Sequence, residues 1–162
     1  MNAIKILEDQ HREVEQMFKA FEKADIEQKE VIFTQLADAL AAHATLEEKV
    51  FYPAVLVNQT EEELREAVEE HLSVKRILSD LLDMEATDEQ FDAKMSALKE
   101  QVEHHVGEEE TEMFVKVSKL FGKEELEALG VEMENFLATL MVEDEEPRLN
   151  TRNETDEAAP LS

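Results

Sequence analysis

The sequence contains the same polar step twice, a histidine followed four residues later by a glutamate, within otherwise apolar helical stripes. The first step is His43 with Glu47, and the second is His105 with Glu109. Residues four apart lie one above the other on a single face of an α-helix, so each pair can reach one metal ion together. The two steps therefore predict two helices that meet at a two-metal site.

Four stretches of the chain place apolar residues at steps of three or four, the period of an amphipathic helix. We expect helices over about residues 2–24, 25–53, 60–82 and 87–121. Asp25 and Thr60 are expected to cap the second and third of these helices, and Pro53 to bend or end the second. Each stripe carries one inward-facing histidine, namely His11, His43, His71 and His105.

An internal repeat relates the two halves of the chain. The series Leu36, Leu40, His43, Glu47 corresponds position for position to Leu98, Val102, His105, Glu109. Two helical hairpins of like design are expected to pair around a pseudo-twofold axis. Only three glycines and three prolines occur in the sequence, which is typical of a mostly helical protein. We predict an all-α fold with an antiparallel up-down four-helix bundle over residues 1–121.

Two further segments follow the predicted bundle. Residues 122–142 are expected to form a fifth, shorter amphipathic helix that covers one end or side of the bundle. Residues 143–162 contain few large apolar side chains, two prolines and mixed charge, a composition typical of a disordered acidic tail. A docking segment for a protein partner is the alternative, and the composition favours the simpler interpretation.

The neighbours His104 and His105 can be told apart by helical geometry. At about 100° per residue, His105 stays within roughly 40° of Leu98, whereas His104 falls about 120° away. His105 is therefore predicted to face inward and His104 to face away.

The charge balance bears on the kind of partner that the protein can have. The sequence has 16 basic and 41 acidic residues and a net charge of −25, which repels nucleic acid and anionic membranes and favours cations. It has no cysteine, which excludes disulfides, cysteine-ligated zinc or iron–sulfur clusters, and thiol catalysis. Neither a secretory leader nor an apolar run of bilayer length is recognised. We expect a cytoplasmic protein without nucleic-acid or membrane partners.

The inward polar residues form a plausible ligand set of four imidazoles and two carboxylates. A single histidine on an apolar stripe is usually a hydrogen-bonded core residue. Here all four stripes carry one, and each buried glutamate would cost roughly several kcal/mol without a cation. Split over two ions, the set leaves coordination positions for a bridging group and a small exogenous molecule. Iron, manganese, zinc and cobalt all accept such ligands.

The motifs resemble the hemerythrin family, specifically the hemerythrin-like HHE cation-binding domains. The resemblance covers about residues 3–121 and rests on four motifs, DQHREVE, HATLEEKVFYP, EEHLSVK and HVGEEETEMF. It implies a four-helix bundle that holds a non-haem di-iron centre with bridging carboxylates and an oxo or hydroxo bridge. The metal ligands that it implies are His11, His43, Glu47, His71, His105 and Glu109.

The chain departs from the oxygen-carrying hemerythrins at two ligand positions. Those proteins have a further histidine one turn beyond the third-helix ligand, where this chain has Lys75. They also use an aspartate at a slightly longer spacing, where this chain has Glu109. Because the loss of a terminal histidine leaves one iron more open, the departure favours redox or peroxide chemistry over reversible oxygen carriage.

Tyr52 has two interpretations. By ideal helix geometry it lies about 160° from Leu36, off the ligand face, which makes it a packing residue. It precedes Pro53, however, and distortion at a proline can re-aim a side chain. HATLEEKVFYPAV resembles the bacterial single-domain branch in which a tyrosine at this place approaches or ligates an iron. The resemblance implies that Tyr52 is a ligand or a redox-active donor.

The function that the resemblance implies is a di-iron protein that binds or reduces O2, H2O2 or NO, with peroxide dismutation as the reaction if it is an enzyme. The alternative is a module for oxygen or iron binding, storage or sensing without turnover. A ferritin-like di-iron carboxylate protein would carry Glu-x2-His on two helices, and only Glu8 with His11 fits that pattern.

Overall fold

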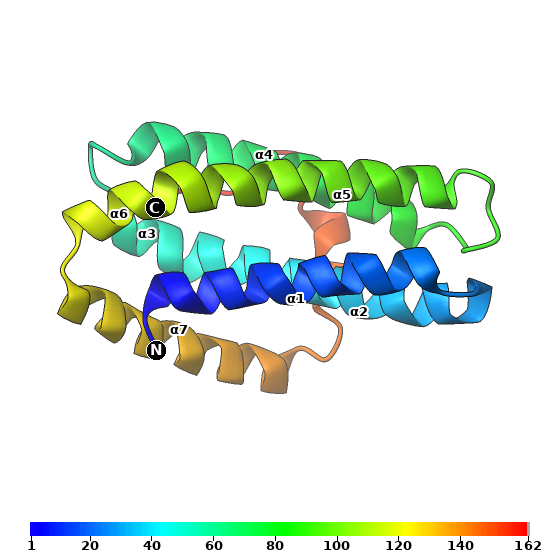
Figure 1. Ribbon diagram of the computed structural model, residues 1–162, viewed down its shortest axis with the longest axis horizontal. Coiled ribbons are helices and arrows are strands. Elements are labelled where there is room, and N and C mark those ends of the chain that lie inside the picture. Colours follow the sequence, from blue (N-terminus) through cyan, green and yellow to red (C-terminus); the bar gives the residue numbers. More distant parts are fainter. Residues whose placement is uncertain (162) are drawn as a thin grey trace.

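The computed structural model describes residues 1–161, and every regular element within them is helical (Figure 1). The α-helices are α1 (Ala3–Lys23), α2 (Ile26–Leu46), α3 (Tyr52–Val55), α4 (Glu61–Leu82), α5 (Phe91–Glu108), α6 (Phe114–Leu120) and α7 (Lys123–Glu143). Two π-helical turns, η1 (Glu47–Phe51) and η2 (Glu109–Met113), join α2 to α3 and α5 to α6. A 3-10 helix, η3 (Pro147–Asn153), follows α7. Within the described residues, no helix has the length and apolarity needed to cross a bilayer.

The bundle consists of two antiparallel hairpins. In Figure 1, α1 runs beside α2, and α4 runs beside α5, with the chain reversing direction at each connection. The α2–η1–α3 and α5–η2–α6 segments each form one long interrupted helix, so four helical rods make up the bundle. The predicted all-α four-helix bundle is confirmed.

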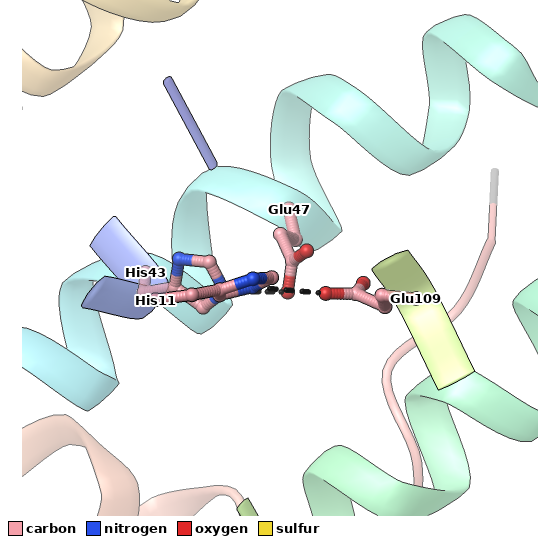
Figure 2. Close-up of side chains that lie close together, drawn as sticks. All are labelled: His11, His43, Glu47 and Glu109. Carbon is pink, nitrogen blue, oxygen red and sulfur yellow. Dashed lines mark ion pairs between the residues drawn. The ribbon is translucent and has the colours of Figure 1, made fainter. Parts of the chain in front are cut away.

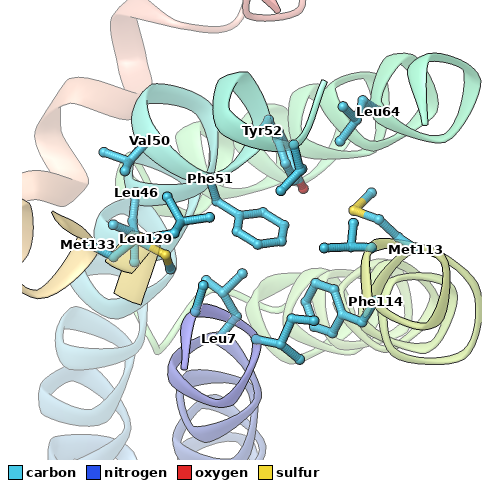
Figure 3. Packing of buried hydrophobic residues seen from close by; sticks show 14 of the residues in the cluster. Leu7, Leu46, Val50, Phe51, Tyr52, Leu64, Met113, Phe114, Leu129 and Met133 are labelled. Carbon is cyan, nitrogen blue, oxygen red and sulfur yellow. The ribbon is translucent and has the colours of Figure 1, made fainter. Parts of the chain in front are cut away.

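Two apolar clusters fill the interior, one toward each end. Figure 3 shows the cluster around Leu7, Phe51 and Phe114. The other cluster includes Phe18 and Leu98. Along each of the four rods the inward histidine falls between the residues of the two clusters. The polar residues therefore lie in a layer closed by apolar side chains on both sides, where unpaired charge is costly.

Helix α7 lies where the fifth helix was predicted, at Lys123–Glu143 against the expected residues 122–142, and it is no shorter than the first two helices. It has 21 residues, the same number as α1 and α2. Its buried residues Leu126, Leu129 and Met133 join the cluster of Figure 3, and it packs along α1 and α2. Because this apolar stripe has a whole flank of the bundle to cover, the helix continues to Glu143.

The predicted disorder of residues 143–162 is wrong for the residues that the structure describes. We call residues 144–161 the C-terminal strap, and it packs across α2 and α4. Its Thr151 and Leu161 are buried. The Arg148 guanidinium donates to both carboxylate oxygens of Asp38 at 3.2 and 3.0 Å. Composition did not predict this order because ion pairs with the bundle and a few buried side chains hold the strap, rather than many apolar residues.

The predicted helix boundaries hold in part. Asp25 caps α2 by accepting a hydrogen bond from the Gln28 N–H at 2.9 Å. The capping box at Thr60 is wrong, because its hydroxyl instead donates to the Val55 carbonyl at 2.7 Å and closes the α3–α4 connection. Pro53 does not end the helix at its own position: it lies in the first turn of α3, directly after η1, and α3 ends at Val55.

Candidate metal centre

Both interrupted rods place their π-turn directly at the glutamate of the His-x3-Glu step. The N–H of Tyr52 bonds to the carbonyl of Glu47, and the N–H of Phe114 bonds to that of Glu109. Each bond spans five residues instead of four, so one extra residue is accommodated in the turn. The side chains after each turn are thereby rotated by about 100° relative to a continuous α-helix.

The four inward histidines aim their Nε2 atoms at the two buried carboxylates. His43 Nε2 lies 3.1 Å from Glu47 Oε1, and His11 Nε2 lies 3.2 Å from Glu109 Oε1. Figure 2 shows these four side chains converging from α1, α2 and the two π-turns. In the other half of the site, His71 Nε2 lies 3.0 Å from Glu47 Oε1. The layer thus brings together residues that are far apart in sequence.

The donor atoms fall into two groups that share one carboxylate. His11, His43, Glu47 and Glu109 form one group, and Glu47, His71 and His105 form the other, with the ligand atoms of each group within 4.8 Å of one another. His105 Nε2 also lies 3.4 Å from Glu109 Oε1. A carboxylate common to both groups is the arrangement that lets one glutamate bridge two cations.

Each histidine is oriented through its second ring nitrogen. The Nδ1 partners are Glu110 for His11, Gln10 for His43, Glu48 for His71 and Glu70 for His105, at 2.7, 2.6, 2.6 and 2.8 Å. A hydrogen bond to Nδ1 fixes the ring and leaves Nε2 free to bind a metal. These four partners were missed in the sequence. Two of them had a signal, because Glu48 and Glu110 directly follow the two glutamates of the repeat.

Tyr52 points into the centre, contrary to ideal helix geometry. Its side chain is fully buried, and its hydroxyl donates to Glu109 Oε2 at 2.6 Å. The same hydroxyl oxygen lies 3.3 Å from His71 Nε2. The rotation introduced by η1 is the physical reason, since the extra residue carries position 52 back toward the ligand face.

Burial and the neighbouring charges oppose one another in this layer. Burial alone lowers the pKa of His105, but the nearby Glu109 and Glu47 carboxylates raise that pKa well above its ordinary value. Burial alone raises the pKa of Glu47, yet the charges and hydrogen bonds of the surrounding histidines hold it well below its ordinary value. For Tyr52, burial and the negative charge of Glu109 act together and raise the pKa well above 10.0. Its hydroxyl therefore keeps its proton as a hydrogen-bond donor.

The residues fit a pair of cations. Four buried atoms lack a hydrogen-bond partner among the described residues: His11 Nε2, His43 Nε2, Glu47 Oε2 and Glu109 Oε1. His11 Nε2 and Glu109 Oε1 approach to 3.2 Å without the geometry of a hydrogen bond. Such atoms are rare in a folded interior, because each costs about 1–3 kcal/mol. Imidazole nitrogen and carboxylate oxygen are suitable ligands for divalent transition metals.

All six predicted ligands lie in this one layer, and their ligation stays a prediction. His104 faces away, as expected, with its side chain 63% exposed. Its Nε2 lies 3.2 Å from Glu70 Oε2 and 3.1 Å from Glu108 Oε1 on the bundle surface.

A cavity of about 40 Å³ adjoins the four histidines. Leu40, Leu78 and Val102 line it. Because one water molecule needs about 10–15 Å³ of such space, the cavity holds only a few atoms.

Known proteins share part of this sequence and this fold. The chain is 27% identical over 133 residues to a Nostoc sp. (strain PCC 7120) protein named DNA nickase, which covers 82% of this chain and 38% of that protein. The chain thus spans well under half the length of this relative. The crystal structure of a hemerythrin HHE cation binding domain-containing protein from Mycobacterium kansasii matches with a TM-score of 0.78 and 21% identity, over 93% of this chain and 99% of that one.

The family comparison covers most of the bundle. The profile described as "Hemerythrin HHE cation binding domain" matches residues 2–117, a range that contains all six converging histidines and glutamates. The chain therefore belongs to the hemerythrin HHE cation-binding domain family.

Proposed function

We propose that the protein is a non-haem di-iron protein that binds or reduces a small oxidant, with dismutation of hydrogen peroxide as its reaction. The donor set of four imidazoles and two buried carboxylates supports a pair of transition-metal ions. Iron is the metal implied by the family resemblance, although manganese or zinc would accept the same ligands.

The observation that carries the proposal is the Tyr52 hydroxyl inside the ligand layer. It lies 2.6 Å from Glu109 Oε2 and 3.3 Å from His71 Nε2, fully buried. The equivalent position in the other half is Phe114, which has no hydroxyl. A phenol in only one half would make the two metal positions chemically different. The ring packs as Phe114 does, and the added hydroxyl would give one position a ligand or a hydrogen-bond donor.

The cavity supports a small substrate. Its volume of about 40 Å³ suits a molecule of two or three heavy atoms. Apolar walls of Leu40, Leu78 and Val102 keep bulk water from the ligands, and exclusion of water strengthens the electrostatic interactions inside. O2, NO and H2O2 meet the size limit, and a peptide, nucleotide or sugar does not.

Dismutation balances without an external reductant. One H2O2 is oxidised to O2 and releases two electrons and two protons, while a second takes them up and is cleaved at its O–O bond to two H2O. A bound metal pair supplies the change of oxidation state and the open coordination positions. The chain orients the imidazoles through their Nδ1 partners, excludes water, and keeps the Tyr52 hydroxyl protonated as a hydrogen-bond donor to Glu109 within the ligand layer.

The alternative is oxygen or iron binding without turnover. The same apolar cavity would admit O2, and the same residues would hold the metals. The name of the Nostoc relative does not alter the proposal, because the net charge of −25 repels the DNA backbone.

The test starts from protein reconstituted with iron. We expect about two irons per chain, near-ultraviolet absorption typical of a bridged iron pair, and O2 release from H2O2 at an oxygen electrode. Tyr52→Phe should keep its iron but lose at least about tenfold in O2 release, as for removal of a positioned hydrogen-bond donor. The matched variant Phe114→Tyr places a phenol in the other half and should not restore activity to Tyr52→Phe.

Two outcomes would change the proposal. Iron-loaded protein that releases no O2 from H2O2 would eliminate dismutation, and reversible changes of its spectrum with O2 or NO would then support the binding alternative. A protein that takes up no more iron than His43→Ala would eliminate the metal centre itself.

A further inference from the structure

The C-terminal strap is fastened to two rods of the bundle, at α2 and at α4. Arg148 clamps Asp38 of α2 through its side chain and its backbone N–H. Arg152 lies 3.1 Å from Asp83 beyond α4, and the Arg76 side chain on α4 donates to the Thr155 carbonyl at 2.9 Å. The strap therefore bridges two rods of different hairpins, and η3 carries two of the three fastenings, Arg148 and Arg152.

Strap residues form one wall of the cavity next to the ligands. Pro147, Asn150, Thr151 and Glu154 line the same space of about 40 Å³ as the four histidines. On the outside, a groove of about 650 Å³ runs between α1, α2 and the end of α7. The cavity and the groove share Pro147, Val14 and His43 as lining residues. Pro147 thus stands between a wide external groove and the small internal cavity.

Lys75 connects the strap to a ligand histidine. Its side chain is 8% exposed, and its Nζ lies 2.9 Å from Glu48 Oε1 and 3.1 Å from Glu154 Oε1. The other oxygen of Glu48 lies 2.6 Å from His71 Nδ1. A continuous line of charged contacts therefore runs from Glu154 on the strap, through Lys75 and Glu48, to His71. A buried lysine with two carboxylate partners loses a contact whenever the strap moves away.

We propose that the C-terminal strap is the lid that sets which molecules reach the metal layer, and that Lys75 and Arg148 hold it closed. Entry then runs from the external groove past Pro147 into the cavity, and the closed strap admits only molecules of a few atoms. The inference rests on the proposed function only in that a molecule must reach a bound metal, and it holds for an oxidant substrate and for a carried ligand alike.

A second groove offers the competing route. It has a volume of about 320 Å³, lies between α1 and α5, and shares Val102 and Val106 with the cavity. Val106→Ala widens that route without touching the strap, whereas Glu154→Gln and Arg148→Met loosen the strap without touching α5. The two routes therefore respond to different substitutions.

The experiment measures strap opening and ligand entry separately on the full chain. Strap opening is read as hydrogen exchange of the amides of residues 148–153, with and without metal. Entry is read as the stopped-flow association rate of azide, a small anionic ligand, with the iron-loaded protein. The matched control is Glu157→Gln, an exposed glutamate of the same strap.

We expect Glu154→Gln to raise both rates about two- to fivefold, as for loss of a partly exposed ion pair. Arg148→Met should raise them about tenfold, because the Arg148 guanidinium contacts both carboxylate oxygens of Asp38 in a half-buried pair. Lys75→Met should raise both rates and shift the metal absorption through Glu48 and His71, and Lys75→Arg should restore them.

Faster hydrogen exchange with an unchanged azide association rate, or no change in either rate, would overturn the lid proposal. A rise in the azide rate confined to Val106→Ala would assign entry to the α1–α5 groove instead. Absence of peroxide turnover affects none of these readouts.

Discussion

Tyr52 and Phe114 occupy equivalent positions in the two halves of the bundle. Each directly follows the π-turn that starts at a glutamate of the centre. The Tyr52 ring stacks on His71 with centroids 5.5 Å apart, and the Phe114 ring stacks on His11 at 5.9 Å. The internal repeat thus extends to the stacking of each ring on a ligand histidine, and at this position the two halves differ by one hydroxyl.

Loss of the shared carboxylate should affect both metal positions. Glu47 belongs to both groups of donor atoms, whereas His43 belongs to one. Glu47→Gln keeps the volume but removes the charge, and we expect metal content to fall below about one ion per chain, because two cations then share a single buried carboxylate. His43→Ala should retain more metal than Glu47→Gln. Metal analysis after gel filtration measures both.

The control for Glu47→Gln is Glu62→Gln, an exposed glutamate on α4. It should leave the metal content unchanged. Equal metal content in Glu47→Gln and Glu62→Gln would contradict a bridging role for Glu47.

The Nδ1 partners should determine metal affinity without touching the metal. Glu70 Oε1 lies 2.8 Å from His105 Nδ1. We expect Glu70→Ala to weaken metal binding by about 10- to 100-fold, the usual effect of losing such a partner. Glu70→Gln should recover much of the loss, because Gln10 already performs this task for His43. Competition with a chelator of known affinity measures the change, and the exposed neighbour Glu69→Ala is the control. A similar loss in both alanine variants would point to a general charge effect.

Metal removal should destabilise the fold. Without cations, the fully buried Glu47 and Glu109 carboxylates repel one another, and only His105 and His11 hold the pKa of Glu109 below its ordinary value against burial and that repulsion. A metal that binds only the folded chain adds about 2.7 kcal/mol at a concentration of 100 Kd. We therefore expect chelator-treated protein to unfold at a clearly lower temperature, followed by circular dichroism. Unchanged unfolding on metal addition would show that the layer is stable without cations.

The contact between the chain start and α7 should depend on Gly130. A Cβ at this position would lie 1.8 Å from the Met1 carbonyl oxygen. Gly130→Ala gains up to about 1 kcal/mol of helix propensity, but the clash costs about 1–3 kcal/mol, and we expect a net loss of stability in urea unfolding. Gly107→Ala on α5 is the matched control, since nothing lies within 4 Å of its Cβ, and it should stabilise the protein. A gain at both positions would contradict the close packing of α7.

Sequence periodicity predicted the bundle and the ligand layer because both depend on the same repeat of 3.6 residues. His11, His43, His71 and His105 keep a constant phase with their apolar neighbours, and no irregularity precedes them on their helices. The orientation of Tyr52 could not be obtained in this way, because the π-turn changes the phase between Glu47 and position 52. No single residue type encodes such a turn.

The strap was missed for a different reason. The strap is anchored by Asp38, Lys75 and Asp83, which lie on the bundle. The composition of residues 143–162 alone gives no information about these partners. An acidic segment with few apolar residues is disordered when no other part of the protein binds it. Here the arginines of the strap meet acidic residues of the bundle.

The two π-turns separate the bundle into parts that can vary independently. Residues up to Glu47 and Glu109 carry the ligands in one helical phase, and the residues after each turn reach the same centre in another. A single base change at codon 52 or 114 can therefore exchange a phenol for a phenyl ring in either half while every ligand stays in place. Relatives with this architecture have an easy evolutionary path between symmetric and asymmetric centres.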